Sequence, residues 1–297
     1  MVIGVFDSGV GGLSVWRELA RLMPDEPTLY LADQAHVPYG SRCLSEVRDL
    51  TTTCVRWLIH QGCSMVIIAC NTASAASLHH VRQLFPSTPF VGMEPAVKPA
   101  ALQTHTGVIG VLATQATFQG ELFASVVMRF ASNVRVIEQP CPGWVTLVEG
   151  AATSEGPPSG AATGETGSLE NCQPLVEHYV IPLLEAGADT LVLGCTHFPF
   201  LAPAIRCCVD QWSARRVPGY EIALVDPSAA VARQAMRVRD RHGLSKPVGN
   251  QPHRFYTTGD VAAFTTLARR LLPEHPHLQA ELCDTQQIEC RLPIRRE

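Results

Sequence analysis

The sequence has little that suits a nucleic-acid or membrane partner. It contains no run of Lys or Arg, and its 23 basic residues are outnumbered by 27 acidic ones, which gives a formal net charge of −4. Proteins that bind nucleic acid or an anionic membrane surface usually carry a basic patch. No stretch reaches the roughly 18 apolar residues of a membrane span, and Met1 leads directly into an apolar strand without the pattern of a secretion signal. We therefore expect a cytoplasmic protein with no nucleic-acid and no membrane partner.

Disulfide and zinc frameworks are also missing. The chain has 11 cysteines, an odd number, and no C-x-x-C pair, which argues against a disulfide scaffold and a ribbon-type zinc site. His197 has no partners at metal-ligand spacing, so no metal site is predicted. A buried free cysteine behaves as a small hydrophobic residue. We expect that role for five of them, Cys43, Cys54, Cys63, Cys207 and Cys208, whereas Cys283 and Cys290 lie in a polar tail and are assigned no role.

The sequence does contain a regular alternation of strands and helices. At 297 residues it exceeds what one core usually organises, so two domains of about 100–150 residues are expected. In the first half, strands are predicted at 2–6, 28–32, before Cys70 and at 89–93, with helices at about 45–60 and 72–84. Such alternation predicts a parallel, doubly wound sheet.

The same plan restarts at residue 107. Strands are predicted at 107–112, 134–138 and before Cys195, with helices at 141–150 and 174–185. The second copy is longer mainly because of residues 151–167, whose small and polar side chains predict a flexible surface loop. The sequence therefore predicts an α/β protein of two similar doubly wound parallel-sheet domains, related by pseudo-two-fold symmetry, with the active site in the cleft between them.

A glycine-rich turn at residues 7–12, D-S-G-V-G-G, joins the first strand to an amphipathic helix. It matches neither the dinucleotide-binding pattern nor the P-loop, and it lacks the lysine that would hold a triphosphate. The carboxylate of Asp7 would also repel a phosphate group. From the residues alone, Asp7 is equally suited to cap the following helix and to act in catalysis.

Cys70 and Cys195 differ from the other cysteines in position. Each follows a short apolar strand and precedes polar residues, in V-I-I-A-C-N-T-A-S at 66–74 and L-V-L-G-C-T-H-F-P at 191–199. In open α/β sheets, ligands bind at the carboxyl ends of the strands. If the two copies face each other, these thiols lie on opposite sides of one small ligand.

Two opposed acid/base groups can invert a carbon centre, because one removes a proton from one face and the other returns one to the opposite face. A thiol with a pKa near ~8.5 suits both roles. Asp7 on the first side, and Glu149 with His197 on the second, are suited to orient the thiols or to carry their protons.

Several short motifs then occur in a fixed order. They are F-D-S-G at 6–9, P-Y-G at 38–40, A-C-N-T-A at 69–73, L-V-E at 147–149, G-C-T-H-F-P at 194–199, V-D-P-S at 225–228 and Y-T-T-G-D at 256–260. Their order and spacing resemble those of glutamate racemase, in the aspartate/glutamate racemase superfamily, from about residue 2 to residue 272. The resemblance implies a cofactor-independent racemase that interconverts L- and D-glutamate and supplies the D-isomer for peptidoglycan.

The resemblance also implies how the chain is divided and what it binds. Residues 1–97 and 210–297 form the first domain, and residues 98–209 form the second. Glutamate is the expected small-molecule partner, and no cofactor is expected. A homodimer is compatible with the resemblance.

The family's functional residues map onto this sequence as follows. Cys70 and Cys195 resemble the two catalytic thiols, with Asp7, Glu149 and His197 as their helpers. The expected substrate contacts are short hydroxyls, an amide and backbone groups, at Ser8, Tyr39, Gly40, Ser41, Asn71, Thr72, Thr114, Thr117 and Thr196. Such groups can hold two carboxylates by hydrogen bonding without a buried lysine or arginine.

The chain departs from the family pattern at Gly143 and Trp144, before Glu149, and in the inserted loop 151–167. Three alternatives stay open at this stage. A racemase acting on aspartate or a hydantoin would differ only in its pocket. A non-catalytic amino-acid-binding protein would need the hydroxyls but not both thiols. A thiol redox enzyme would need cysteine Cα atoms within about 7 Å, closer than two thiols that flank a substrate.

Overall fold

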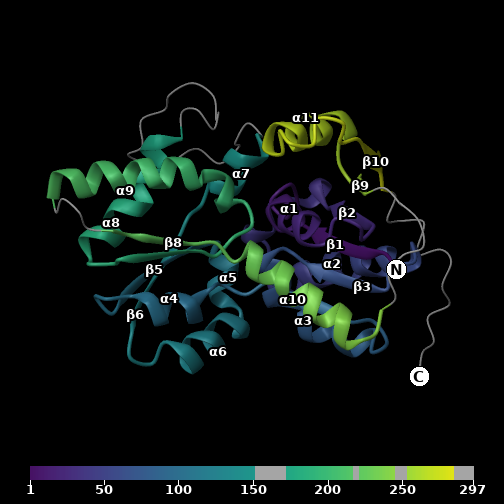
Figure 1. Ribbon diagram of the computed structural model, residues 1–297, viewed down its shortest axis with the longest axis horizontal. Helices are drawn as coiled ribbons and strands as arrows, with labels where there is room; N and C mark the ends of the chain where they lie inside the picture. Colours follow the sequence, from purple (N-terminus) through teal and green to yellow (C-terminus); the bar gives the residue numbers. More distant parts are fainter. Residues whose placement is uncertain (151–171, 217–220, 245–252, 284–297) are drawn as a thin grey trace.

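The computed structural model describes residues 1–150, 172–216, 221–244 and 253–283. The inserted loop predicted at 151–167 and Cys290 lie outside these residues. Within them the chain forms two sheets in two lobes that lie side by side (Figure 1), and all strand pairs are parallel. No helix of this described part is long and apolar enough to cross a membrane.

The first sheet is built around three fully buried strands, β2 (Thr28–Ala32), β1 (Ile3–Asp7) and β3 (Met65–Ile68). In the described residues its strands follow the order β10 (Ala280–Leu282), β9 (Arg254–Thr257), β2 (Thr28–Ala32), β1 (Ile3–Asp7), β3 (Met65–Ile68) and β4 (Phe90–Gly92). Apolar runs such as M-V-I-I predict strands of this kind, because both faces of a central parallel strand are covered by helices.

Helices cover both faces of the first sheet, since successive side chains of a strand point to opposite faces. On β1, Val5 packs into one apolar cluster and Phe6 into another. The Val5 side includes α1 (Leu13–Leu22), α10 (Ser228–Arg241) and α11 (Val261–Leu271). The Phe6 side includes α2 (Leu44–His60) and α3 (Asn71–Leu84).

The second sheet is smaller and is covered in the same way. Its described strands follow the order β6 (Arg135–Pro140), β5 (Val108–Ala113), β7 (Thr190–Leu193) and β8 (Ala223–Val225). One face packs on α8 (Gln173–Glu185) and α9 (Ala202–Arg216), and the other on α4 (Val97–Gln103) and α6 (Glu121–Phe130). Two short helices, α5 (Gln115–Gln119) and α7 (Trp144–Glu149), follow strands of this sheet.

The predicted duplication is visible in the strand order. The sequence β2-β1-β3-β4 in the first sheet has the same arrangement as β6-β5-β7-β8 in the second. The ends of the central strands match in detail: Ala69 N donates to Phe6 O at 2.7 Å, and Gly194 N donates to Leu112 O at 2.7 Å. In each copy the next residue is a cysteine, which confirms the predicted strand-end position of both thiols.

The chain returns from the second lobe to the first later than residue 210, which is the boundary predicted from the sequence. Residue 210 lies inside α9, and β8 then pairs with β7. The chain therefore stays with the second sheet as far as Val225, and α10, which packs on α1, is the first element back.

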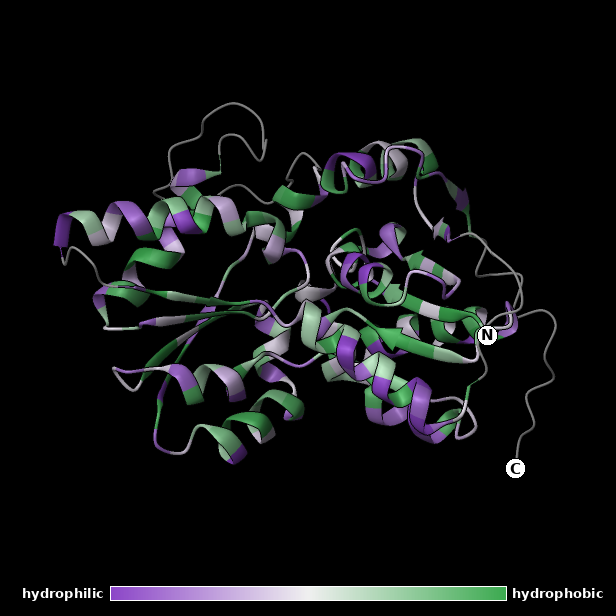
Figure 2. Cartoon of the chain, in the orientation of Figure 1, coloured by the Kyte–Doolittle hydropathy of each residue, from purple (hydrophilic) through white to green (hydrophobic). Residues whose placement is uncertain are grey.

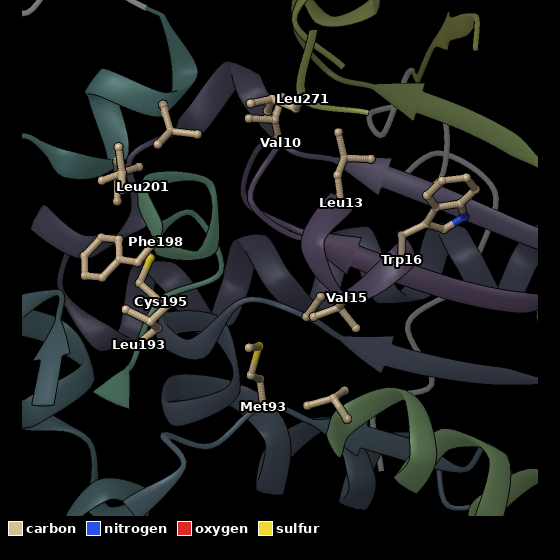
Figure 3. Close-up of a cluster of buried hydrophobic side chains, with 14 of the residues drawn as sticks. Val10, Leu13, Val15, Trp16, Met93, Leu193, Cys195, Phe198, Leu201 and Leu271 are labelled. Atoms are coloured by element: carbon tan, nitrogen blue, oxygen red, sulfur yellow. The ribbon is translucent and has the colours of Figure 1, made fainter. Parts of the chain in front are cut away.

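One apolar cluster runs through both lobes. It contains Val10 and Leu13 from the first lobe and Leu193 and Phe198 from the second (Figure 3). Hydrophobic residues are concentrated in the strands and on the inner faces of the helices (Figure 2). Burial of apolar surface therefore stabilises the contact between the lobes as well as each lobe.

The cysteines follow the predicted pattern only in part. Cys54, Cys63 and Cys208 are buried as expected, but Cys43 and Cys207 are exposed, so the core role predicted for these two is wrong. Cys207 lies on the solvent-facing side of α9, and Cys43 precedes α2, where hydrogen bonds from the Ser45 hydroxyl at 3.2 Å and a backbone N–H lower its pKa.

Cys283 is also placed differently from the prediction. It is 5% exposed and packs with the first lobe's core, and its N–H donates to Thr257 O at 2.8 Å. The polar surroundings of Cys283 in the sequence hide this position, because β10 pairs with β9 and brings the segment back to the sheet.

Candidate active site

The two lobes meet at the carboxyl ends of their central strands, and Asp7 is the last residue of β1. Its Oδ1 accepts the N–H of Gly9 at 2.8 Å, and its Oδ2 accepts the hydroxyl of Thr196, from the second lobe, at 2.9 Å. Asp7 does not cap the following helix, because α1 begins at Leu13. Complete burial raises the pKa of Asp7, and the nearby His197, Gly9 and Thr196 offset this only in part.

Cys70 lies two residues beyond β3 and caps α3. Its Sγ accepts the N–H of Ala73 at 3.4 Å and lies 3.6 Å from the hydroxyl of Ser8. Burial, followed by the negative charge of Asp7, raises the pKa of Cys70 to about 12. Cys70 is therefore a protonated thiol at neutral pH.

Cys195 occupies the equivalent position beyond β7 and has a different neighbour. Its Sγ lies 3.7 Å from Nδ1 of His197, whose Nε2 lies 2.7 Å from Oε1 of Glu149. Burial lowers the pKa of His197, but the hydrogen bonds to Cys195 and Glu149 outweigh it and hold the pKa well above its usual value. The protonated imidazole can donate to both partners at once.

The glycine-rich turn makes room for Glu149 and His197. A Cβ on Gly9 would overlap the carboxylate of Glu149 and lie 2.7 Å from its Cδ, and a Cβ on Gly11 would lie 2.6 Å from Cε1 of His197. The N–H of Val10 donates to Oε1 of Glu149 at 2.8 Å. The turn therefore receives a carboxylate and an imidazole from the second lobe.

Three threonines and an asparagine form a polar patch across the junction. The hydroxyl of Thr114 lies 2.9 Å from those of both Thr72, from the first lobe, and Thr117. Among the described residues, Asn71 is buried with neither its amide nitrogen nor its amide oxygen hydrogen-bonded. Buried polar groups are normally paired, so the amide of Asn71 is suited to contact a polar ligand.

The P-Y-G turn forms the short 3-10 helix η2 (Tyr39–Ser41) beside this patch. A Cβ on Gly40 would lie 2.8 Å from Cβ of Thr114, so Gly40 permits a close contact between the lobes. The hydroxyl of Tyr39 donates to Asp33 at 2.6 Å, and burial raises its pKa well above the usual value. Ser41 lies on the exposed side of η2.

Sequence reasoning missed several groups that support the site from the first lobe. The hydroxyl of Tyr30 donates to Gly9 O at 2.7 Å, the hydroxyl of Ser14 donates to Thr196 O at 3.0 Å, and Gln34 contacts Glu149. Residues of these types are common in strands and helices, so nothing in the local sequence marks them as part of the site.

Metal-ligating side chains do not gather in the described part of the chain, where no group of three or more His, Cys, Asp or Glu residues is placed to hold a metal ion. The charged groups of the site instead pair with each other or with backbone N–H groups, as in the Glu149–His197 pair, whose side chains are 4% and 2% exposed.

The family profile and the similar sequences both point to one family of racemases. The profile of the Asp/Glu/Hydantoin racemase family matches residues 3–235. The chain is 45% identical over 271 residues to a glutamate racemase of Roseiflexus sp. (strain RS-1), and the match covers 91% of each protein.

Solved structures agree with the sequence matches. A glutamate racemase isoform from Bacillus anthracis aligns with a TM-score of 0.76 at 29% identity, over 95% of this chain and 97% of that one. The glutamate racemase of Francisella tularensis subsp. tularensis SCHU S4, in complex with D-glutamate, aligns with a TM-score of 0.75 at 25% identity, over 96% and 98%.

Fold and relatives together define an isomerase of the amino-acid racemase class. The chain belongs to the Asp/Glu/Hydantoin racemase family.

Proposed function

We propose that this protein is a cytoplasmic glutamate racemase. It interconverts L- and D-glutamate without a cofactor, by proton transfer at Cα between Cys70 and Cys195, and it supplies D-glutamate for peptidoglycan synthesis. Its curated relatives carry the name glutamate racemase, and the Francisella protein binds D-glutamate.

The observation that carries this proposal is the equivalence of the two thiols. Cys70 and Cys195 follow the third strand of each copy, and each has a charged helper from its own surroundings. They are close enough that a charge on Cys195 contributes to the raised pKa of Cys70. Opposed thiols of this kind suit a reaction that removes a proton from one face and adds one to the other.

The neighbours of the two thiols suggest how one direction begins. By analogy with the family, Cys195 acts as the base toward L-glutamate: its sulfur, which lies beside His197, takes the Cα proton and leaves the electron pair on Cα. The thiol of Cys70 then gives its proton to the opposite face, so one Cα–H bond breaks and another forms. The cycle ends with a thiol at Cys195 and a thiolate at Cys70, from which the reverse reaction starts.

Substrate recognition follows from the polar patch. The unpaired amide of Asn71 and the hydroxyls of Thr72, Thr114 and Thr117 offer donors on both sides of the junction. Hydroxyl, amide and backbone donors can bind carboxylates well when they are oriented in advance.

Racemisation measured by circular dichroism tests the substrate assignment. Purified protein without added cofactor should abolish the optical signal of both L- and D-glutamate and leave L-aspartate nearly unchanged. Turnover of aspartate without turnover of glutamate would show that the substrate is wrong.

Solvent isotope tests the two-base mechanism. In D₂O the product should carry deuterium at Cα, while recovered substrate carries little early in the reaction, because each thiol takes its proton from solvent on its own side. A single base that serves both faces would return the original hydrogen. Early retention of that hydrogen in the product would therefore rule out the opposed thiols.

A further inference from the structure

Gln34 connects the first lobe to the helper groups of Cys195. It begins the short 3-10 helix η1 (Gln34–His36), just after β2, and is partly buried. Its Nε2 donates to Oε2 of Glu149 at 2.8 Å. Glu149 ends α7 in the second lobe, so this contact spans the junction between lobes.

The two oxygens of Glu149 have different partners. Oε1 accepts from the N–H of Val10 at 2.8 Å and pairs with Nε2 of His197 at 2.7 Å, whereas Gln34 supplies the hydrogen bond to Oε2. The side chain of Glu149 is only 4% exposed, and a buried oxygen without a donor is costly. Loss of the Gln34 amide would therefore favour rotation of the carboxylate away from its present orientation.

Gln34 is itself oriented by the first lobe. The hydroxyl of Thr257 on β9 donates to Oε1 of Gln34 at 3.2 Å and accepts the N–H of Gly259 at 3.1 Å. A Cβ on Gly259 would lie 2.9 Å from Cβ of Gln34, so the two segments pack closely. Because the Thr257 hydroxyl occupies the oxygen end of the amide, the nitrogen end faces Glu149.

We propose that Gln34 is a positioning residue: it holds Glu149 in the orientation that supports His197 and, through His197, the thiol of Cys195. The role rests on the proposed racemase function. It follows from a chain of contacts that runs from Thr257 through Gln34 and Glu149 to His197.

Gln34→Met tests this role, because methionine has a similar length and no amide donor. The matched control is Gln173→Met, since Gln173 also donates from a partly buried amide to a carboxylate, that of Glu177 at 3.0 Å, but in α8. Steady-state racemisation of both enantiomers is measured together with the primary isotope effect of Cα-deuterated L- and D-glutamate. Circular dichroism and thermal melting check that each variant folds.

We expect Gln34→Met to lower kcat/KM about tenfold in both directions, the equivalent of losing one hydrogen bond to a charged group. The isotope effect should rise chiefly for the enantiomer deprotonated by Cys195, which is L-glutamate by analogy with the family. Gln173→Met should change neither quantity. Gln34→Asn, which is one methylene too short to reach Glu149, should repeat the effect of Gln34→Met.

Other outcomes overturn the positioning role in distinguishable ways. Wild-type protein without glutamate racemisation refutes the proposed function and this role with it. An active wild type with nearly unchanged Gln34→Met and Gln34→Asn variants refutes the role alone. Unchanged isotope effects for both enantiomers, together with a lower melting temperature, would mean that Gln34 only stabilises the fold.

Discussion

Gly9→Ala is the sharpest test of the contact between the glycine turn and the second lobe. Gly9 does not have a positive φ, so alanine is compatible with its backbone and introduces no local strain. The added methyl group would instead overlap the carboxylate of Glu149, whose Cδ would lie 2.7 Å away. The substitution therefore acts on Glu149 without changing a residue that carries a charge.

The size of the effect follows from this geometry. The carboxylate must move on the order of 1 Å, and a displacement of this size in an active site can cost about 10²-fold in rate. It would lengthen the hydrogen bonds that Oε1 makes with Val10 N at 2.8 Å and with His197 at 2.7 Å. We expect kcat/KM to fall about 10²-fold, or ~2.7 kcal/mol, in both directions. The free energy of unfolding should fall by only about 1–3 kcal/mol.

Gly4→Ala, on strand β1 just before this turn, provides the control. A Cβ there would meet Cys63 Sγ at 3.2 Å and Leu58 Cδ1 at 3.3 Å, in the core and away from the strand end. It should cost stability without a comparable loss of racemisation by circular dichroism. Gly9→Ala with more than about a third of wild-type kcat/KM would refute the reasoning, because it would mean that Glu149 is not needed in this position.

Three further predictions concern the thiols and their helpers. Cys70→Ala and Cys195→Ala should each fold but lose at least ~10²-fold in kcat, as expected for loss of a general acid/base; activity above about a tenth of wild type in either would contradict the two-base mechanism. Because the pKa of Cys43 is lowered and that of Cys70 is about 12, iodoacetamide should label Cys43 at a lower pH than it labels an ordinary thiol and leave Cys70 unlabelled there, and mass spectrometry showing equal labelling would be inconsistent with the burial of Cys70. Asp7→Asn should raise the Cα-deuterium isotope effect chiefly for D-glutamate and His197→Asn chiefly for L-glutamate, while kcat/KM falls equally in both directions; identical changes would show that the two helpers serve the site as a whole.

The parts of the site that could be predicted lie next to clear sequence signals. A buried parallel strand is recognisable as an apolar run, and ligands bind where such strands end, so the strand-end positions of Cys70 and Cys195 follow from the sequence. The repeat of this pattern also predicts the duplicated fold, which the matching strand orders confirm.

The remaining features depend on contacts between distant segments. Gly9 touches Glu149, 140 positions along the chain, and no local pattern indicates which side chain fills the space above a glycine. Adjacent residues of a helix point in different directions, so Cys207 and Cys208 cannot both face the core. The apolar residues of α9 form no clear stripe, so the sequence does not show which of the two is buried. The late return to the first lobe was missed for a similar reason: α9 continues past residue 210, and β8 is too short to stand out.

Asp7 and Glu149, the two carboxylates of the candidate site, are each held by hydrogen bonds from the opposite lobe. Asp7 belongs to the first lobe and accepts from Thr196 of the second, whereas Glu149 belongs to the second and accepts from Val10 and Gln34 of the first. Movement of the lobes apart would break both sets of hydrogen bonds together. In the mechanism proposed above, each direction needs one thiol to accept a proton and the other to donate one. A site that holds Asp7 and Glu149 by the same contact between lobes would then be complete for both enantiomers or for neither.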